Sequence, residues 1–229
     1  MPPATDSIRA FLDYLSHEAA ASPLTIETYQ SDLRSFTTYA EERLSEPFVP
    51  SEGDLDLVRG WLSVKLDEGL KASTVGRCLT SVRSFYRHLL KTGQIKRNPI
   101  QALRPPKAAR PLPVYVPTED MEQMLSEEID PTDWRAVRDH LILTMLYECG
   151  LRRSEIAGLR DQAVDTTERQ LKVLGKGRKE RIVPFGKGLA EEIEAWRHLR
   201  TSIFGTTESF FVSSKGTPMA PRAVYQVAH

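Results

Sequence analysis

The chain has 229 residues, 40% of them hydrophobic and 27% charged, and its 31 basic and 31 acidic side chains cancel. This length suffices for two domains that each bury a core, and the composition is that of an ordinary globular protein. No apolar run approaches the ~20 residues of a membrane-spanning helix, and the N-terminus lacks a signal-peptide pattern, so we expect a cytoplasmic protein without membrane contact. Cys78 and Cys149 lie far apart among apolar neighbours, which favours buried thiols over disulfide or redox chemistry.

The zero net charge hides an asymmetry along the chain. Residues 1–72 carry 6 basic and 13 acidic side chains, whereas residues 73–110 carry 9 basic and no acidic ones. Residues 111–229 carry 16 basic and 18 acidic side chains. A surface in contact with water alone usually mixes both signs, so a long stretch without a carboxylate indicates a patch for a polyanion.

Helical periodicity predicts a first domain over residues 1–104. Its helices are expected over about 7–20, 23–43, 54–68 and 73–92. Ser22 is the predicted N-cap of the second helix, with Pro23 at its first position, and Ser73 is the predicted cap of the fourth. Gly69 and Gly93 mark the ends of the third and fourth helices.

The fourth helix is predicted to be amphipathic, with charges of one sign on its polar face. At 100° per residue, its apolar face carries Val75, Leu79, Val82, Tyr86, Leu89 and Leu90. The opposite face carries Arg77, Arg83, Arg87 and Lys91, together with Ser73, Thr80, Ser84 and His88. The basic run continues into Lys96, Arg97, Arg104, Lys107 and Arg110. We therefore favour contact with nucleic-acid phosphates over a plain solvated face.

A proline-rich segment separates this domain from a second one. Residues 105–117 hold too many prolines for a helix or a central strand, so an extended and fairly stiff linker is expected. A proline-rich ligand for a partner domain is the less favoured alternative. The second domain is then predicted over residues 118–229.

The second domain is predicted to mix helices with a small hairpin. Helices are expected over about 118–128, 132–149, 154–159 and 188–204, with Thr118 as the first cap and Gly150 at the end of the second. Strand-like runs over 171–174 and 181–185 form the hairpin, and a short strand is expected over 210–212. A last helix opens near Pro221 and shows no stop signal before His229, so we expect a chain that is cut short.

Two segments of the second domain carry candidate chemistry. Arg152 follows the glycine that closes a buried helix, and its guanidinium can offer two donors to phosphate oxygens. Glu155, one turn later, could orient Arg152 or another basic group, and a purely structural Arg–Glu pair is the alternative. Lys176, in the glycine-flanked hairpin turn, could protonate a leaving alkoxide or neutralise a phosphate. The alternative for Lys176 is a plain surface lysine.

The rest of the hairpin is basic, and other site types find little support. Arg178, Lys179 and Arg181 suit a finger laid along a DNA groove. No histidine pair has zinc-ligand spacing and no carboxylate cluster suggests a two-metal nuclease, so no metal is expected. None of the tyrosines is flanked by a base-like arrangement, so no nucleophile is assigned.

These segments together resemble the tyrosine recombinases of the phage-integrase family, Xer type. The matching residues are Ser22-Pro23-Leu24-Thr25 with Tyr29 and Leu33, the helix from Arg77 to Leu90, Asn98-Pro99, Pro111-Leu112-Pro113, Gly150 to Ile156 and Gly175 to Arg181. The resemblance implies a mainly α-helical protein: a SAM-like helical core-binding domain, then a mixed α/β catalytic domain with a small antiparallel sheet. It also implies DNA strand cleavage through a tyrosine and a 3′-phosphotyrosyl intermediate, without a metal or nucleotide cofactor.

The resemblance assigns roles residue by residue. Arg152 matches the first catalytic arginine, Glu155 the supporting acidic residue, and Lys176 the hairpin lysine that protonates the 5′-hydroxyl leaving group. The family's His-x-x-Arg segment and nucleophilic tyrosine have no match in residues 1–229, and Tyr225 does not correspond to that tyrosine. We therefore expect the chain to bind DNA without cleaving it.

The resemblance also implies partners. These are a double-stranded recombination site on the nucleoid and further recombinase protomers, as a dimer at each site and a tetramer at the synapse. One alternative function is a non-catalytic DNA-binding module or regulator that occupies recombination sites. Another is a helical protein whose basic stretch contacts an acidic protein.

Overall fold

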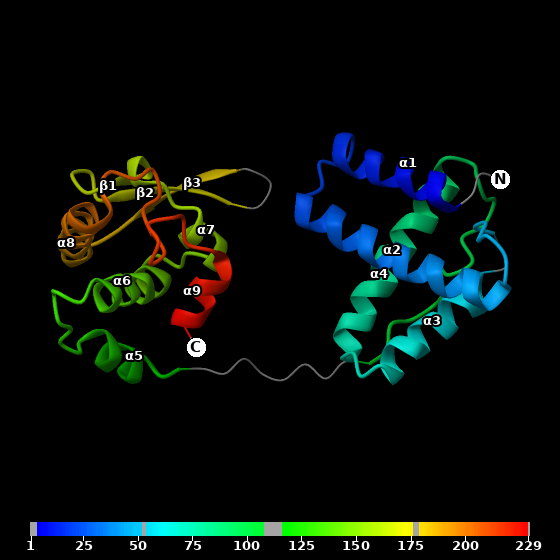
Figure 1. Cartoon of the computed structure of the whole chain (residues 1–229), viewed down its shortest axis with the longest axis horizontal. Coiled ribbons are helices and arrows are strands. Elements are labelled where there is room, and N and C mark those ends of the chain that lie inside the picture. The colour runs from blue at the N-terminus through cyan, green and yellow to red at the C-terminus, as the bar shows by residue number, and fades with distance from the viewer. Residues whose placement is uncertain (1–3, 52–53, 108–115, 176–178, 229) are drawn as a thin grey trace. The chain divides into compact units, whose positions relative to one another are not determined.

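The computed structural model describes residues 4–51, 54–107, 116–175 and 179–228. The chain divides into two compact units, Met1–Leu112 and Pro113–His229, each with a hydrophobic core of its own (Figure 1). The fold is mainly α-helical with a small antiparallel sheet, as predicted. Within the described ranges, no helix has both the length and the apolar character needed to cross a membrane.

The first unit is a helical bundle. Its described helices are α1 (Ala4–His17), α2 (Pro23–Leu44), α3 (Leu55–Asp67) and α4 (Ala72–Lys91). The predicted start of α2 is confirmed, since the Ser22 hydroxyl accepts a hydrogen bond from the Thr25 N–H at 3.2 Å and Pro23 occupies the first turn. Helix α4 packs against each of the other three helices and is therefore the centre of this unit's core.

The apolar face of α4 is buried largely as predicted. Five of its six predicted residues are fully buried: Val75, Leu79, Val82, Tyr86 and Leu89. The sixth prediction is wrong, because Leu90 is 40% exposed. The prediction that His88 belongs to the polar face is also wrong, because its ring is buried against Phe11 and Tyr14 of α1. The face of α4 that is buried in the structure is wider than the predicted sector, because Ser81 and Phe85 are buried as well, and it has His88 at one edge and Leu90 just outside the other.

Two predicted helix caps are misplaced. Lys71 rather than Ser73 precedes α4, and Pro117 rather than Thr118 precedes α5 (Thr118–Leu125). Lys71 and Pro117 have extended backbones, with ψ of 143° and 146°, and the helical conformation starts at the next residue. An N-cap is defined by that extended backbone, so the hydroxyl residues lie inside the first turn.

In the second unit a small sheet lies at one edge of a group of helices (Figure 1). Its further described helices are α6 (Trp134–Glu148), α7 (Arg153–Ala157), the 3₁₀ turn η1 (Asp161–Ala163), α8 (Lys187–Phe204) and α9 (Pro221–Val227). The strands β1 (Val164–Asp165), β2 (Gln170–Leu174) and β3 (Glu180–Pro184) are antiparallel in the order β1-β2-β3. The predicted hairpin is the β2–β3 pair, and its register places Val173 opposite Arg181.

The strand predicted over residues 210–212 is wrong. All three residues are buried, but the pairing here consists of isolated bridges, one joining Arg160 to the preceding Ser209 and one joining Val212 itself to Pro218. The Phe210 carbonyl instead accepts the indole N–H of Trp196 at 2.9 Å and a guanidinium N–H of the buried Arg200 at 3.0 Å. Side chains of α8 therefore satisfy a backbone group that a strand would use in its ladder.

Candidate nucleic-acid interface

Arg152 starts from a rigid backbone position. Gly150 has a left-handed backbone (φ 57°) directly after α6, and Leu151 beside it is buried. The backbone N–H of Arg152 then donates to Glu155 Oε2 at 2.8 Å, which satisfies a free donor at the start of α7. The end of one helix and the cap of the next therefore fix where the Arg152 side chain begins.

Glu155 lies between two guanidinium groups. Its side chain is 3% exposed, and Arg181 on β3 binds it with both fork nitrogens, Nη1 to Oε1 at 2.6 Å and Nη2 to Oε2 at 2.9 Å. Nη1 of Arg152 donates to Oε1 at 3.0 Å. The hydrogen bonds from Arg181, and then those from Arg152, outweigh burial and lower the pKa of Glu155 from 4.5 to about 2.

The two arginines around Glu155 present different surfaces. The Arg152 side chain is 68% exposed, whereas that of Arg181 is 36% exposed and its fork is occupied by the carboxylate. One carboxylate between two guanidinium groups leaves an excess positive charge, and that charge reaches solvent mainly through Arg152. The arrangement can hold an anion such as a phosphate oxygen at Arg152.

Arg181 was predicted to lie along a DNA groove, and its structural surroundings are different. It joins the turn end of the hairpin to the start of α7 through Glu155. This pairing was not predicted, although Glu155 was expected to orient a basic group. Contact of Arg181 with DNA stays a prediction.

A backbone hydrogen bond continues the strand pairing one residue beyond β2 and β3. The Gly175 N–H donates to the Lys179 carbonyl at 2.8 Å, and Lys179 itself is exposed. A β-carbon on Gly175 would lie 3.4 Å from that carbonyl and 3.6 Å from Nη1 of Arg181. Residue 175 therefore borders the Glu155 cluster, which is Glu155 with Arg152 and Arg181. Lys176 and Arg178, the other predicted hairpin residues, lie outside the described residues.

The four basic residues predicted on α4 have different surroundings. Arg77 forms a two-pronged ion pair with Asp32 of α2, with N–O distances of 2.5 and 3.1 Å. Arg83 donates to the backbone carbonyl of Leu103. Nζ of Lys91 lies 4.7 Å from the centre of the Tyr14 ring. Arg87 is exposed and, within the described part of the chain, forms no ion pair or hydrogen bond.

The sequence did not single out Asp32 as the centre of a buried cluster. Its side chain is 9% exposed and also accepts the Ser81 hydroxyl at 2.5 Å and the Cys78 thiol at 3.5 Å. One clue was present, because Asp32 precedes the buried Leu33 and stands one turn before the buried Phe36. An acidic residue beside an apolar stripe indicates a buried partner of opposite charge.

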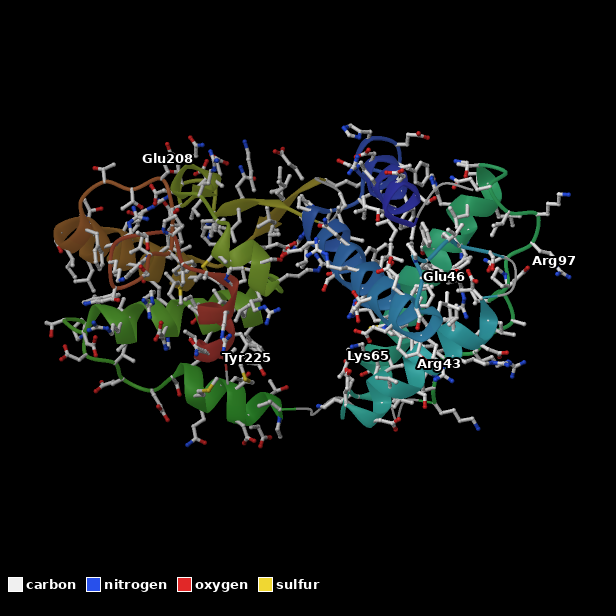
Figure 2. The ribbon with its side chains drawn as sticks, turned by 45° about the vertical axis from the view of Figure 1, so that its right-hand side comes forward. Arg43, Glu46, Lys65, Arg97, Glu208 and Tyr225 are labelled. Carbon is white, nitrogen blue, oxygen red and sulfur yellow. The ribbon has the colours of Figure 1, made fainter. Side chains whose placement is uncertain are left out.

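Tyr225 lies on α9, which packs against α7 (Figure 2). Its side chain is partly exposed, and the guanidinium carbon of Arg153 lies 5.4 Å from the centre of its ring. This is a cation–π contact with the residue that follows Arg152. The expectation that Tyr225 is not the nucleophile stays a prediction.

Comparison with known proteins places both units in one family. Residues 115–229 match the phage integrase family, and residues 8–93 match the phage integrase N-terminal SAM-like domain. The chain is 33% identical over 228 residues to the tyrosine recombinase XerC of Pelobacter propionicus, a match that covers 99% of this chain and 74% of that protein. The chain belongs to the phage integrase family. The predicted resemblance to a Xer-like tyrosine recombinase is thereby confirmed.

Another XerC protein and two solved integrase structures are also similar to this phage integrase family member. XerC of Pseudomonas syringae pv. syringae is 34% identical over 217 residues, with 94% of this chain and 71% of that protein covered. A lambda integrase tetramer bound to a Holliday junction is similar with a TM-score of 0.69 at 15% identity, covering 99% of this chain and 64% of that chain. The Tn1549 transposon integrase in complex with transposon right end DNA has a TM-score of 0.67 at 16% identity, covering 95% and 74%. At these identities the solved structures establish the fold.

Proposed function

We propose that this chain is part of a site-specific DNA recombinase. It binds a duplex recombination site, with the basic face of α4 and the residues around Arg152 in contact with the DNA phosphates. In the complete enzyme, one strand is cleaved and rejoined through a 3′-phosphotyrosyl intermediate. Membership of the phage integrase family and the likeness to integrases bound to DNA support the proposal.

The observation that carries the proposal is the arrangement of Arg152. Its side chain is 68% exposed, yet it is tethered through Glu155 to a second arginine on the sheet. A surface arginine that only stabilised the fold would need no such rigid support, whereas a group that positions a phosphate does. We assign Arg152 to the scissile phosphate, Glu155 to its support and Lys176 to protonation of the leaving 5′-hydroxyl. Arg178, Lys179 and Arg181 contribute the basic character of the hairpin.

The assembly and location are part of the same proposal. Two protomers occupy each recombination site, and four form the synapse on cytoplasmic, nucleoid-associated DNA. The likeness to a lambda integrase tetramer on a Holliday junction supports this stoichiometry. We propose residues 1–104 as the core-binding domain, 105–117 as the linker and 118–229 as the beginning of the catalytic domain.

Duplex binding can be measured by fluorescence anisotropy with the 229-residue chain. Affinity should fall steeply as salt rises from about 50 to 200 mM, because bound phosphates release counterions. Arg152→Ala should weaken binding more than Lys187→Ala, which removes one exposed positive charge from the same unit. Equal effects of the two variants, or no duplex binding, would contradict the proposal.

Cleavage separates the recombinase from a non-catalytic regulator. The 229-residue chain should form no covalent adduct with a nicked duplex, because none of its tyrosines matches the family's nucleophile; an adduct through Tyr225 would overturn this part. In a chain extended with the family's His-x-x-Arg segment and tyrosine, Lys176→Ala should abolish cleavage and preserve binding. A regulator would bind the same DNA and show no cleavage in the extended chain.

A further inference from the structure

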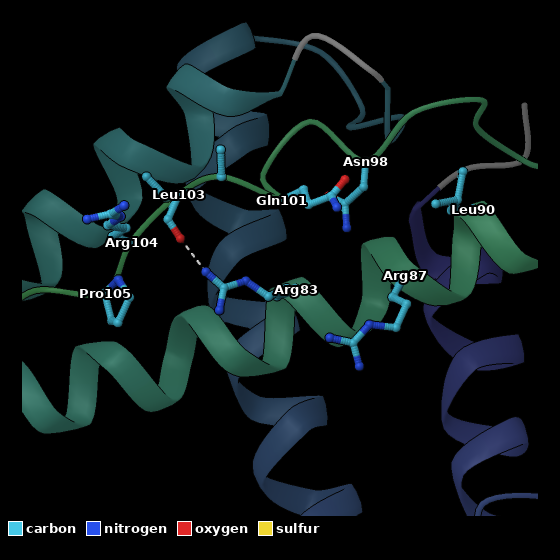
Figure 3. Close-up of a pocket in the computed structure, with 9 residues that line it drawn as sticks. Arg83, Arg87, Leu90, Asn98, Gln101, Leu103, Arg104 and Pro105 are labelled. Atoms are coloured by element: carbon cyan, nitrogen blue, oxygen red, sulfur yellow. Dashed lines mark hydrogen bonds between the residues drawn. The ribbon is translucent and has the colours of Figure 1, made fainter.

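A pocket opens on the first unit between α4 and the segment that follows it. Its volume is about 600 Å³, and it is lined on the α4 side by Arg83, Arg87 and Leu90. The facing side comes from residues 98 and 101–105 (Figure 3). The pocket is separate from the Glu155 cluster, which belongs to the other unit.

The α4 side of the pocket carries two arginines one helical turn apart. Arg83 is held in place because its guanidinium donates to the Leu103 carbonyl across the pocket (Figure 3). Arg87 is exposed, and no described residue pairs with it. Arg104 adds a third positive charge at the rim, and no acidic residue lines the pocket. The pocket therefore attracts anions.

The facing side offers amide donors. The Asn98 side-chain oxygen accepts the Ile100 backbone N–H at 3.0 Å, which assigns its NH₂ group as the end that is free to donate. In Figure 3 the side chains of Asn98 and Gln101 lie on the side of the pocket opposite the two arginines. Guanidinium donors from one side and amide donors from the other suit a small anion with several acceptor oxygens.

We infer that this pocket is a subsite for one backbone phosphate of duplex DNA. The inference rests on the proposed function and adds a specific seat to it. Arg87 supplies charge, Arg83 supplies a fixed guanidinium, and Gln101 and Asn98 supply neutral hydrogen bonds. Phosphate contacts of this kind position a protein on the duplex without reading its sequence. Arg77 does not line this pocket and is paired with Asp32.

The contribution of this subsite can be measured from the slope of the logarithm of the DNA-binding constant against the logarithm of the salt concentration. Arg87→Ala should reduce the magnitude of that slope by about 1, and weaken binding about equally for unrelated duplex sequences. Gln101→Ala should weaken binding and leave the slope unchanged, because an amide displaces no counterion. The matched control is Arg59→Ala, which removes an exposed arginine of α3 in the same unit. Because Arg87 has no described partner, its removal should leave thermal unfolding unchanged.

Titration with inorganic phosphate tests the chemistry without DNA. NMR signals of the Asn98 and Gln101 side-chain amides should shift with phosphate in the unmodified chain and not in Arg87→Ala, and duplex DNA should abolish the phosphate-induced shift. Phosphate binding that DNA does not displace would mean that the pocket serves a free phosphate compound, and would overturn the inference. An unchanged salt slope in Arg87→Ala would also overturn it. If the unmodified chain binds no duplex DNA at all, the proposed function is refuted instead.

Discussion

At the scale of single residues, Glu155 organises the second unit's candidate site. One nearly buried carboxylate receives the fork of Arg181, one nitrogen of Arg152 and the backbone N–H of Arg152. The hydrogen bond to Glu155 restricts the rotamers of the exposed Arg152 side chain. Binding an anion there therefore costs less side-chain entropy than binding at an unrestrained arginine. Glu155 must stay ionised for this, and its lowered pKa of about 2 extends the ionised state to acidic pH.

Acid should destabilise the second unit through Glu155. The pKa of this group is about 2 when folded and near 4.5 when unfolded, so its stabilisation is fully present above pH 4.5 and is lost as pH falls toward 2. The contribution is on the order of 3 kcal/mol. Urea unfolding should therefore show Glu155→Gln less stable than the unmodified chain at pH 7, with the difference shrinking below pH 4.

Arg181→Ala provides the complementary measurement. Because Arg181 is the main cause of the lowered pKa, its removal should move the acid-induced loss of stability to higher pH. Arg181→Lys should restore only part of the effect, since an ammonium group cannot form the two-pronged pair. If all four proteins lose stability over the same range of acidic pH, Glu155 does not contribute to the free energy of unfolding.

At the scale of secondary-structure elements, a polar clamp joins α2 to α4 inside the first unit. Asp32 of α2 accepts both fork nitrogens of Arg77 and the hydroxyl of Ser81, which lie one turn apart on α4. Burial and the nearby Asp32 carboxylate raise the pKa of the Cys78 thiol beside it, which keeps the thiol protonated. The clamp fixes the rotation of α4, and thereby the direction in which Arg83 and Arg87 project.

Removing the charge of Asp32 should loosen this clamp. Asp32→Asn should lower the free energy of unfolding of the first unit by about 2–3 kcal/mol, because Arg77 and Ser81 lose their shared acceptor in a nearly buried site. Asp56→Asn is the matched control, since its ion pair with Arg59 is exposed and worth less than about 1 kcal/mol. Equal losses from the two substitutions in urea unfolding would contradict a structural role for Asp32.

At the scale of the whole molecule, the two units have separate cores. The first core gathers around α4 and Trp61, and the second around α6 and Trp196. The two sets of buried residues have no member in common. Each unit therefore has the apolar interior that independent folding requires.

Differential scanning calorimetry should resolve this independence. We expect two unfolding transitions, with Asp32→Asn lowering the temperature of one and Glu155→Gln that of the other. Each substitution should leave the other transition in place, because the two sites share no partner and belong to units with separate cores. A single transition that moves with either substitution would show that the units unfold together.

The sequence by itself determined the described helices α1 to α9, the β2–β3 hairpin and their order. Periodicity located α4 and its buried face, Ser22-Pro23 defined the start of α2, and Gly150 marked the end of α6. Two strand-like runs joined by a glycine-flanked turn located the β2–β3 hairpin. These features depend on residues within a few positions of one another, so a linear pattern contains them.

Only the tertiary structure decided which side chains meet. Asp32 and Arg77 are 45 residues apart, Glu155 and Arg181 are 26 apart, and Arg83 reaches the carbonyl of Leu103 20 residues away. No period or motif specifies such pairs, because they depend on how helices and strands pack and rotate against one another. The basic residues look alike in the sequence. Packing pairs Arg77 and Arg181 with buried carboxylates and leaves Arg87 and Arg152 exposed, as their proposed phosphate contacts require.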